Sequence, residues 1–327
     1  MKHISILVPQ GDSSLSNLEA THKMFNMAND FLLRMGREPL FKTQLVATHK
    51  DARLSNGIFT IIPDATIDEI KDTDLVIIPA IHGDYKKVIE TNKDFIPWVV
   101  QQYKNGAEVA SLCIGAFLLA STGLLNGKNC ATHWIAADEF RAMFPKVNLV
   151  DDKIITDEHG LYTSGGAYSS LNLNLYLVEK FAGREMAVLS SKVFEIDISR
   201  DSQSPFIIFK GQKSHQDYEI LKVQEFIEAN FHEKLNVDNL CSEMALSRRT
   251  FERRFKKATS NTIVEYMQRV KVEAAKKELE SGRKNVNEVM YDVGYNDPKA
   301  FRDVFRKVTA MTPLDYMNRY SRLKVGV

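Results

Sequence analysis

A segment of twenty residues occurs twice in the last third of the chain, with the two copies fifty residues apart. Eight positions are identical between the copies, where chance matching would give roughly one, so the segment is a true internal repeat. The identical residues are Phe251, Phe255, Lys257, Thr259, Thr262, Tyr266, Met267 and Arg269, which recur as Phe301, Phe305, Lys307, Thr309, Thr312, Tyr316, Met317 and Arg319. Each copy should therefore fold into the same structural unit.

The first copy predicts a helix-turn-helix unit in residues 236–258. A short apolar stretch is followed by Ser247, a good N-cap for a second helix that runs to about Lys257. Phe251 and Phe255 lie four residues apart on this helix and share one face, which we expect to be buried.

The second unit occupies residues 285–308 and repeats the pattern. Its second helix opens with Asp297 and Pro298, a cap residue followed by proline at the first helical position. We call the second helix of each unit a reading helix, because its charged face has the character that entry into a DNA groove requires. The candidate DNA-contacting residues are Arg248, Arg249, Arg253 and Arg254 in the first reading helix and Lys299, Arg302, Asp303 and Arg306 in the second.

Residues 262–281 predict one helix that joins the two units. They contain no proline or glycine, are rich in strong helix formers, and are followed by Gly282. Twenty residues of helix span roughly 30 Å, close to the roughly 34 Å of one duplex turn. Both reading helices could therefore enter successive major-groove segments on one face of DNA.

The charge distribution favours the same interpretation. Residues 215–327 hold 21 Lys and Arg against 17 Asp and Glu, whereas residues 1–214 hold 22 against 25. Residues 248–257 alone contain six cations and one acid. Such a patch can neutralise phosphates and make binding dependent on salt.

These repeats resemble the AraC family of bacterial transcription regulators, whose DNA-binding domain is two helix-turn-helix units joined by one long helix. The resemblance covers residues 217–322 and is most specific over residues 289–313. The matching residues there are Gly294, Tyr295, Phe301, Phe305, Arg306, Lys307, Thr312 and Pro313. It implies that residues 217–327 form a domain that binds double-stranded DNA.

By position, the resemblance implies that Arg249, Arg253, Lys299 and Asp303 face base edges. The family usually carries arginine where this chain has Asp303. A carboxylate can accept a hydrogen bond from the amino group of cytosine. Asp303 is therefore either a base reader or an ordinary exposed charge.

The first two thirds of the chain alternate strand and helix patterns, which predicts an α/β domain with a parallel sheet and helices on both faces. The expected strands are residues 4–8, 75–78 and 108–112, the expected helices are residues 18–35 and 95–103, and a hairpin is expected at residues 53–62 around Asn56 and Gly57. With 327 residues, 44% of them hydrophobic, the chain has ample core for two domains. We expect domains at 1–195 and 217–327, with a linker at 196–216 and the boundary near residue 205.

The three cysteines, Cys113, Cys130 and Cys241, show no metal-ligand spacing, and their odd number favours a reducing compartment over a disulfide framework. We therefore expect a cytoplasmic protein with no bound metal or cofactor. Residues 109–129 carry only one charge, Lys128, and are long enough to suggest a membrane span. Their three glycines and small polar residues argue against one, so we expect no membrane association.

Cys113 is the residue of the N-terminal part with the most suggestive chemistry. It follows an expected strand and precedes an expected helix, as a nucleophile elbow does. A thiol at a helix N-terminus is favoured as thiolate by the helix dipole, and His133 is a candidate imidazole partner. Taken alone, one Cys and one His fit a buried structural cysteine better than a reactive one.

Residues 2–193 resemble the PfpI family within the class I glutamine amidotransferase-like superfamily, which implies a flavodoxin-like parallel sheet. The matching segments are the elbow at Cys113, residues 123–127 leading to Thr132, His133 and Trp134, and the turn at residues 163–166. A PfpI-like domain followed by an AraC-type domain is the order of the GlxA group of regulators, and residues 200–206 resemble the interdomain segment of that group.

Two departures from this family weaken the case for catalysis. Catalytic members carry an acid shortly after the first strand, where this chain has Ser16, with Asp12 and Glu19 displaced from the position. The glycine-rich turn that helps form an oxyanion site is replaced by residues 79–83. Cys113, His133 and Ser16 are therefore predicted to line a non-catalytic ligand pocket, because binding does not need the base and donors that catalysis needs.

The sequence thus predicts a transcription regulator whose N-terminal domain senses an unknown small molecule, forms a homodimer, or does both. RNA polymerase is a candidate further partner. The alternative is a cysteine-dependent hydrolase or lyase of the PfpI type with an accessory DNA-binding domain, and a pure scaffold is a third interpretation.

Overall fold

The computed structural model describes residues 1–54, 58–243 and 247–321 and divides the chain into two compact units, Met1–Gln203 and Ser204–Val327. The division falls inside the expected linker at 196–216. Residues 196–203 belong to the N-terminal unit, and residues 204–216 belong to the C-terminal unit.

The N-terminal unit is built on a seven-stranded sheet. The strands, in spatial order, are β12 (Ile155–Glu158), β13 (Leu161–Ser164), β9 (Glu108–Ser111), β7 (Leu75–Ile78), β1 (Lys2–Leu7), β3 (Phe41–Ala47) and β6 (Ala65–Thr66). All neighbours pair in parallel except β12 and β13, which are antiparallel. Four-residue β7 is fully buried, as a short apolar run in the middle of a parallel sheet should be.

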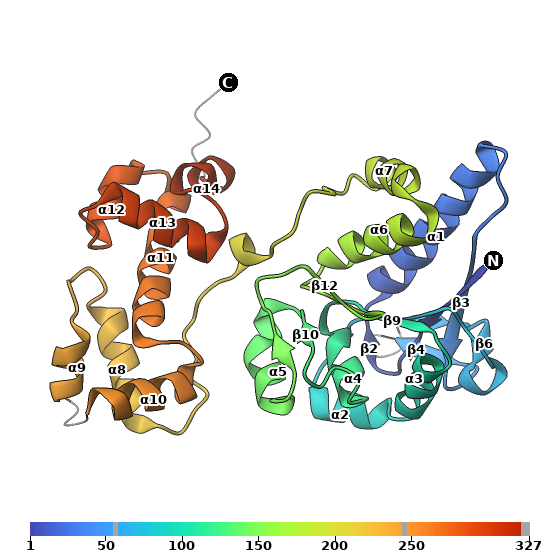
Figure 1. Cartoon of the computed structure of the whole chain (residues 1–327), viewed down its shortest axis with the longest axis horizontal. Helices are drawn as coiled ribbons and strands as arrows, with labels where there is room; N and C mark the ends of the chain where they lie inside the picture. The colour runs from blue at the N-terminus through green and yellow to red at the C-terminus, as the bar shows by residue number, and fades with distance from the viewer. Residues whose placement is uncertain (55–57, 244–246, 322–327) are drawn as a thin grey trace. The chain divides into compact units, whose positions relative to one another are not determined.

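Helices cover both faces of this sheet, as Figure 1 shows. One face packs against α1 (Leu15–Arg34), α6 (Ser169–Ala182) and α7 (Arg184–Val193), and the other against α2 (Tyr85–Thr91), α3 (Phe95–Lys104), α4 (Ala116–Ser121) and α5 (Ala137–Met143). The predicted α/β architecture is therefore confirmed. The antiparallel edge strand β12 and the strands β3, β6 and β13 were not among the predicted strands.

Three short strand pairs lie outside the main sheet: β2 (Asp12–Ser13) with β8 (Ile81–His82), β10 (Asn129–Cys130) with β11 (Asn148–Leu149), and β4 (Ala52–Leu54) with β5 (Phe59–Ile61). The last pair is antiparallel and lies at the predicted hairpin, although its turn at Asn56 and Gly57 falls outside the described residues.

Residues 109–129 form β9, the Cys113 turn and α4, and no helix among the described residues is long and apolar enough to cross a membrane.

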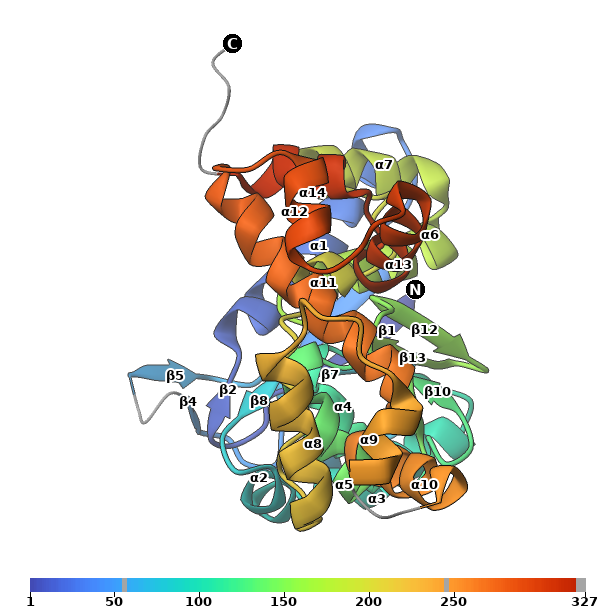
Figure 2. The ribbon, with the colours of Figure 1, turned by 90° about the vertical axis from the view of Figure 1, so that its left-hand side faces the viewer.

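The C-terminal unit is entirely helical in its described part. Its helices are α8 (Tyr218–Ala229), α9 (Val237–Glu243), α10 (Arg248–Thr259), α11 (Ile263–Ser281), α12 (Val286–Asp292), α13 (Pro298–Thr309) and α14 (Pro313–Tyr320). Helices α8 to α10 surround one end of α11, and α12 to α14 surround the other, as both Figure 1 and Figure 2 show. The predicted all-helical domain with two helix-turn-helix units is confirmed, although residues 244–246 of the first unit lie outside the described residues.

The limits of α11 follow from local chemistry. Thr262 and Glu265 form a capping box at its start, in which each side chain accepts a hydrogen bond from the backbone amide of the other residue. At its end, Gly282 adopts φ 69°, a left-handed conformation that glycine enters without steric cost.

The two halves of the unit have separate cores of the same design. In the first, the ring centroids of Phe255 and Tyr266 are 5.3 Å apart, and in the second those of Phe305 and Tyr316 are 5.5 Å apart. Each phenylalanine is fully buried, and the two clusters share no buried member, although the partly buried Phe231 packs against both. The sequence repeat is therefore a repeat of aromatic packing on one helix.

Replacing Phe305 by alanine should destabilise the second half of the unit by about 3–5 kcal/mol, because the change empties a fully buried aromatic site. Amide hydrogen exchange should rise in α12 to α14 while α8 to α10 keep most of their protection. Phe255→Ala is the matched control. In this variant, hydrogen exchange should rise in α8 to α10 while α12 to α14 keep most of their protection. Equal loss of protection in both halves for either variant would contradict the separation of the cores.

Candidate nucleic-acid interface and ligand site

The first reading helix, α10, buries one face and exposes the rest. Ser247 caps it by accepting a hydrogen bond from the amide of Thr250, as the sequence predicts. Phe251 and Phe255 point into the core, whereas Arg249 and Arg253 are exposed. Neither of these two arginines forms an ion pair within the described part of the chain, so both guanidinium groups are available to a ligand.

The other two predicted arginines of α10 already have carboxylate partners. Arg248 pairs with Asp238 at 3.0 Å and with Glu252 at 2.9 Å. Arg254 forms a two-pronged ion pair with Asp217, with N–O distances of 2.6 and 3.0 Å. Hydrogen bonding from Arg254 holds the pKa of Asp217 below its usual value. Because Asp217 also caps α8, Arg254 fastens α10 to the start of that helix.

A hollow of about 340 Å³ lies between α9, α10 and the start of α11. Arg249, Arg253 and Lys256 line it together with Thr262, the N-cap of α11. Glu252 also lines this hollow, but it is paired with Arg248, so the three cations leave a net positive surface that attracts an anion such as a phosphate. Lys256 was not among the predicted contacts, although the run of cations in residues 248–257 includes it.

The second reading helix, α13, exposes Lys299, Arg302, Asp303 and Arg306. Asp297 caps it by accepting from the amide of Lys299, and Phe301 and Phe305 are buried. None of the four exposed residues has an ion-pair partner in the described chain. Asp303 occupies the place that Arg253 holds in α10, so the two reading helices present different charges to DNA.

In the N-terminal unit, Cys113 lies on a sharp turn after β9, with φ 55°. Such a positive φ is strained for a residue other than glycine. Gly115, two residues later, packs so closely that an added Cβ would lie 2.5 Å from the backbone oxygen of Pro79. The predicted elbow geometry is present, and it places the turn directly against the end of β7.

Hydrogen bonds hold the turn from several sides. The Cys113 amide donates to the Ser164 side chain at 3.0 Å, and the Thr132 hydroxyl donates to the Cys113 carbonyl at 3.0 Å. The amide of Ala167 donates to the Cys113 sulfur at 3.3 Å. We call Cys113, His133 and the backbone of residues 164–167 the Cys113 site.

The thiol of Cys113 is not activated in this structure. Its side chain is only 3% exposed, and burial raises its pKa above the ordinary value although the amides of Ala167 and Ile114 oppose the change. The raised pKa opposes the thiolate form that a helix N-terminus would favour, and the burial agrees with a structural cysteine.

His133 forms no hydrogen bond to the Cys113 thiol in the described part of the chain. Its Nδ1 accepts a hydrogen bond from the amide of Ile135 at 3.2 Å. Burial, with a smaller contribution from His82, lowers its pKa, so the ring is neutral at physiological pH. Its ring packs against Gly166, where an added Cβ would come within 2.7 Å of it.

Ser16, the third predicted pocket residue, is exposed at the start of α1, where its hydroxyl lies 3.0 Å from that of Ser14. The adjacent residue, Asn17, is the one that turns inward. It accepts from the amide of Ala80 at 3.1 Å and donates to the hydroxyl of Ser170 at 3.2 Å. An amide in the turn that replaces the family's glycine-rich turn is therefore occupied.

Gln203 is a further residue that the sequence did not reveal. It comes from the interdomain segment, yet its side chain is 1% exposed beside the Cys113 site. Its Oε1 accepts from the amide of Gly166 at 3.0 Å, and its Nε2 donates to the carbonyl of Thr132 at 2.9 Å.

No cluster of His, Cys, Asp or Glu that could hold a metal ion occurs among the residues that the structure describes.

Comparison with known proteins supports both halves of this description. Residues 11–180 match the DJ-1/PfpI family, and residues 240–319 match a helix-turn-helix domain. The chain is 24% identical over 303 residues to the HTH-type transcriptional regulator GbdR of Pseudomonas aeruginosa, an alignment that covers 92% of this chain and 80% of that protein. It is 21% identical over 209 residues to the HTH-type transcriptional regulator GlxA of Rhizobium meliloti, which covers 64% of each.

A crystal structure of a ThiJ/PfpI family protein from Pseudomonas syringae superimposes with a TM-score of 0.50 at 19% identity, over 70% of this chain and 86% of that one. This similarity bears on the fold alone. The family match covers more than half of the chain, and the second match falls on the duplicated helices. The chain is thus a member of the DJ-1/PfpI family that carries an AraC-type double helix-turn-helix domain at its C-terminal end.

Proposed function

We propose that this chain is a sequence-specific DNA-binding transcription regulator in which α10 and α13 enter successive segments of the major groove. The observation that carries the proposal is the pair of identically packed helices that expose Arg249, Arg253 and Lys299 without ion-pair partners in the described chain. Helix α11 has 19 residues, which corresponds to roughly 28 Å, so it separates the two helices by about the repeat of a duplex.

We propose two groups of DNA contacts among the exposed residues of the reading helices. Arg249, Arg253 and Lys299, with Asp303, are assigned to base edges. Lys256, Arg302 and Arg306 are assigned to phosphates, which position the protein without reading sequence. Arg248 and Arg254 would have to leave carboxylate partners to reach DNA, and we assign them to holding α10 in place.

The N-terminal unit is proposed to be the sensor. A neutral buried thiol, an imidazole without a bond to it and an occupied turn amide argue against catalysis at the Cys113 site. Ligand binding there is proposed from the family resemblance. Three free, buried cysteines support a reducing compartment such as the cytoplasm. The family resemblance supports a homodimer that responds to a small molecule, with RNA polymerase as its downstream partner. Effector screening by thermal shift should compare the parent with Cys113→Ala.

Arg253→Ala should weaken binding to a duplex selected from a random pool by about 1–3 kcal/mol and relax base preference at one position, because a base contact is lost. Lys222→Ala is the control, since it removes an exposed cation that belongs to α8 and not to a reading helix. Selection from the random pool gives the base preference, and titration of the selected duplex at fixed salt gives the affinity. An unchanged base preference in Arg253→Ala would remove Arg253 from the base contacts.

Asp303→Arg should change the preferred base at one position of the half-site read by α13. A carboxylate accepts a hydrogen bond from cytosine, whereas arginine donates two to guanine. The parent and the variant should therefore select cytosine and guanine, respectively, and Asp303→Asn separates the effect of charge from that of hydrogen bonding. If all three proteins select the same sequence, Asp303 is an exposed charge and not a reader.

The thiol of Cys113 should be alkylated slowly at neutral pH, and its rate should still be rising above about pH 9, because a raised pKa lowers the thiolate fraction. The measurement is mass-spectrometric labelling with iodoacetamide across pH, with the chain in denaturant as the reference for exposed thiols. A rate that levels off at or below neutral pH would show an activated thiolate and favour the hydrolase or lyase alternative.

A further inference from the structure

A lysine near the middle of α11 is bonded to both halves of the DNA-binding unit. The Nζ of Lys271 donates to the carbonyl of Val293 at 2.9 Å and to the carbonyl of Glu233 at 3.3 Å. Glu233 follows α8 in the first half, and Val293 is the C-cap of α12 in the second. The same ammonium lies 5.5 Å from the centroid of the Tyr295 ring. Lys271 therefore binds the connection that follows α8 and the turn that leads to α13.

The turn of the second half lies directly against the first half at Gly294. This residue has φ 76°, and an added Cβ would overlap the carbonyl of His232 and come within 2.8 Å of the Lys271 Nζ. A larger residue would push the turn away, so glycine permits the close approach. Phe231, next to His232, packs against the buried clusters of both halves. We call residues 231–233, Lys271 and residues 293–294 the joint.

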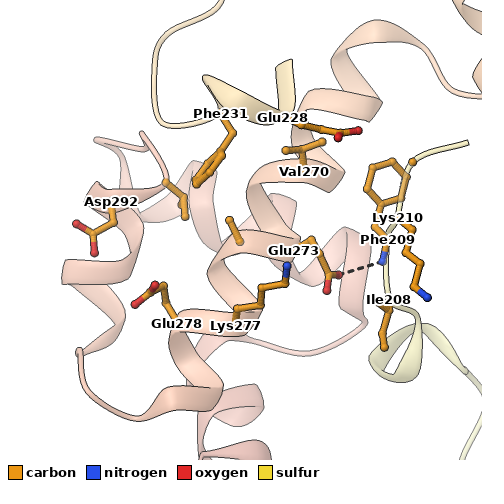
Figure 3. Close-up of a pocket in the computed structure, with 13 residues that line it drawn as sticks. Ile208, Phe209, Lys210, Glu228, Phe231, Val270, Glu273, Lys277, Glu278 and Asp292 are labelled. Atoms are coloured by element: carbon orange, nitrogen blue, oxygen red, sulfur yellow. Dashed lines mark hydrogen bonds between the residues drawn. The ribbon is translucent and has the colours of Figure 1, made fainter. Parts of the chain in front are cut away.

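Away from the joint, the described parts of helices α8 to α10 make few contacts with α12 to α14. A hollow of about 620 Å³ lies beside α11 and is lined by residues of both halves. Figure 3 shows Glu228 and Phe231 from the first half, Val270 from α11 and Asp292 from the second half around it. The angle between the halves therefore depends on few contacts besides those that each half makes with α11.

The segment before α8 forms a second link between the halves. Its turn Ser204–Phe206 packs against α13, and Phe209 packs against the buried cluster of the first half. The carbonyl of Ile207 accepts from Lys276 at 2.6 Å, and the amide of Phe209 donates to Glu273 at 3.1 Å, a bond that Figure 3 shows. This link consists of packing and of bonds to α11 itself. Only at the joint, within the described chain, does a side chain of α11 bond the backbone of both halves.

We propose that Lys271 is a positioning residue for DNA recognition, because its two bonds fix the angle between α10 and α13 about α11. The inference rests on the DNA-binding function proposed above. The length of α11 sets how far apart the reading helices lie, but not how the two halves are turned around it. A duplex rotates by roughly 34–36° for each base pair, since one turn takes 10–10.5 base pairs. A change of angle of this size therefore changes the spacing at which both segments are read.

The ammonium group of Lys271 suits this role because it donates up to three hydrogen bonds, so one side chain can bind carbonyls of two halves. Burial lowers its pKa, and no carboxylate forms an ion pair with it among the residues that the structure describes. The loss of hydration is offset by the two carbonyls, one of them at the C-terminal end of α12, where the helix dipole favours a cation. Methionine at this position would keep a side chain of similar length and lose both bonds.

The first test measures affinity for the selected duplex and for one with a base pair inserted between the segments read by α10 and α13. The parent should bind the second duplex about ten-fold more weakly or worse, because one reading helix loses its register. In Lys271→Met this ratio should fall to about three or less, because two bonds that resist turning are lost. Lys277→Met is the matched control and should keep the ratio of the parent. It changes an exposed lysine of the same helix that forms no ion pair within the described residues.

A ratio in Lys271→Met equal to that of the parent would overturn the proposal. A parent that binds both duplexes equally would also overturn it, since the angle would then set no spacing. A third duplex, in which the segment read by α13 is scrambled, separates positioning from folding. The parent and Lys271→Met should bind it equally, because only the first half then reads bases. Weaker binding of this duplex by Lys271→Met would show damage to the first half and would also count against the proposal.

The second test measures the angle between the halves without DNA. Glu225→Cys in α8 and Asn318→Cys in α14 place one spin label at an exposed position of each half. Pulsed electron paramagnetic resonance of the full chain gives the distribution of distances between the labels. The distribution should be broader with Lys271→Met than with the parent residue or with Lys277→Met. Equal widths would overturn the proposal.

The native cysteines are buried, and a chain without the two introduced cysteines, labelled identically, measures their contribution to the signal. The two tests also separate this inference from the function on which it rests. If the parent binds no selected duplex, the regulator function fails, while the distance distributions still decide whether Lys271 fixes the two halves.

Discussion

The continuity of α11 is the constraint on which the DNA-binding unit depends. Both halves pack an aromatic cluster onto this one helix, Phe255 with Tyr266 at one end and Phe305 with Tyr316 at the other. A capping box and a left-handed glycine set its length, so the separation of the reading helices is a property of the helix and not of flexible loops. The two reading helices act together because both halves of the unit pack onto one continuous helix.

Much of the fold was predictable because its signals are short in range. The caps at Ser247 and Asp297, the helix between Thr262 and Gly282 and the buried strands each depend on residues that are close in the sequence. The repeat is visible because the sequence can be compared with itself. The elbow at Cys113 was predictable for the same reason, since a strand followed by a small-residue turn and a helix is a local pattern.

The details of the sites were not predictable, because each depends on a partner far along the chain. Arg254 looks like any exposed arginine until Asp217, 37 residues earlier, is found beside it. Asn17 and Ser16 differ by one position on α1, and only packing against Ala80 shows which of them turns inward. Burial of the Cys113 thiol likewise comes from the surrounding fold, which no local pattern reports.

The segment that joins the two units belongs in its second part to the DNA-binding unit. Gln212 continues the contacts made by Ile207 and Phe209, since its side chain accepts from Asn261 at 3.0 Å and its carbonyl accepts from Gln224 at 3.0 Å. A natural recombination or an engineered fusion that exchanged the sensor would have to join the new domain before Ser204. A junction placed after Gln212 would remove the carbonyl of Ile207, which accepts a hydrogen bond from the buried cation Lys276. The transferable DNA-binding unit therefore includes residues 204–217 as well as its helices.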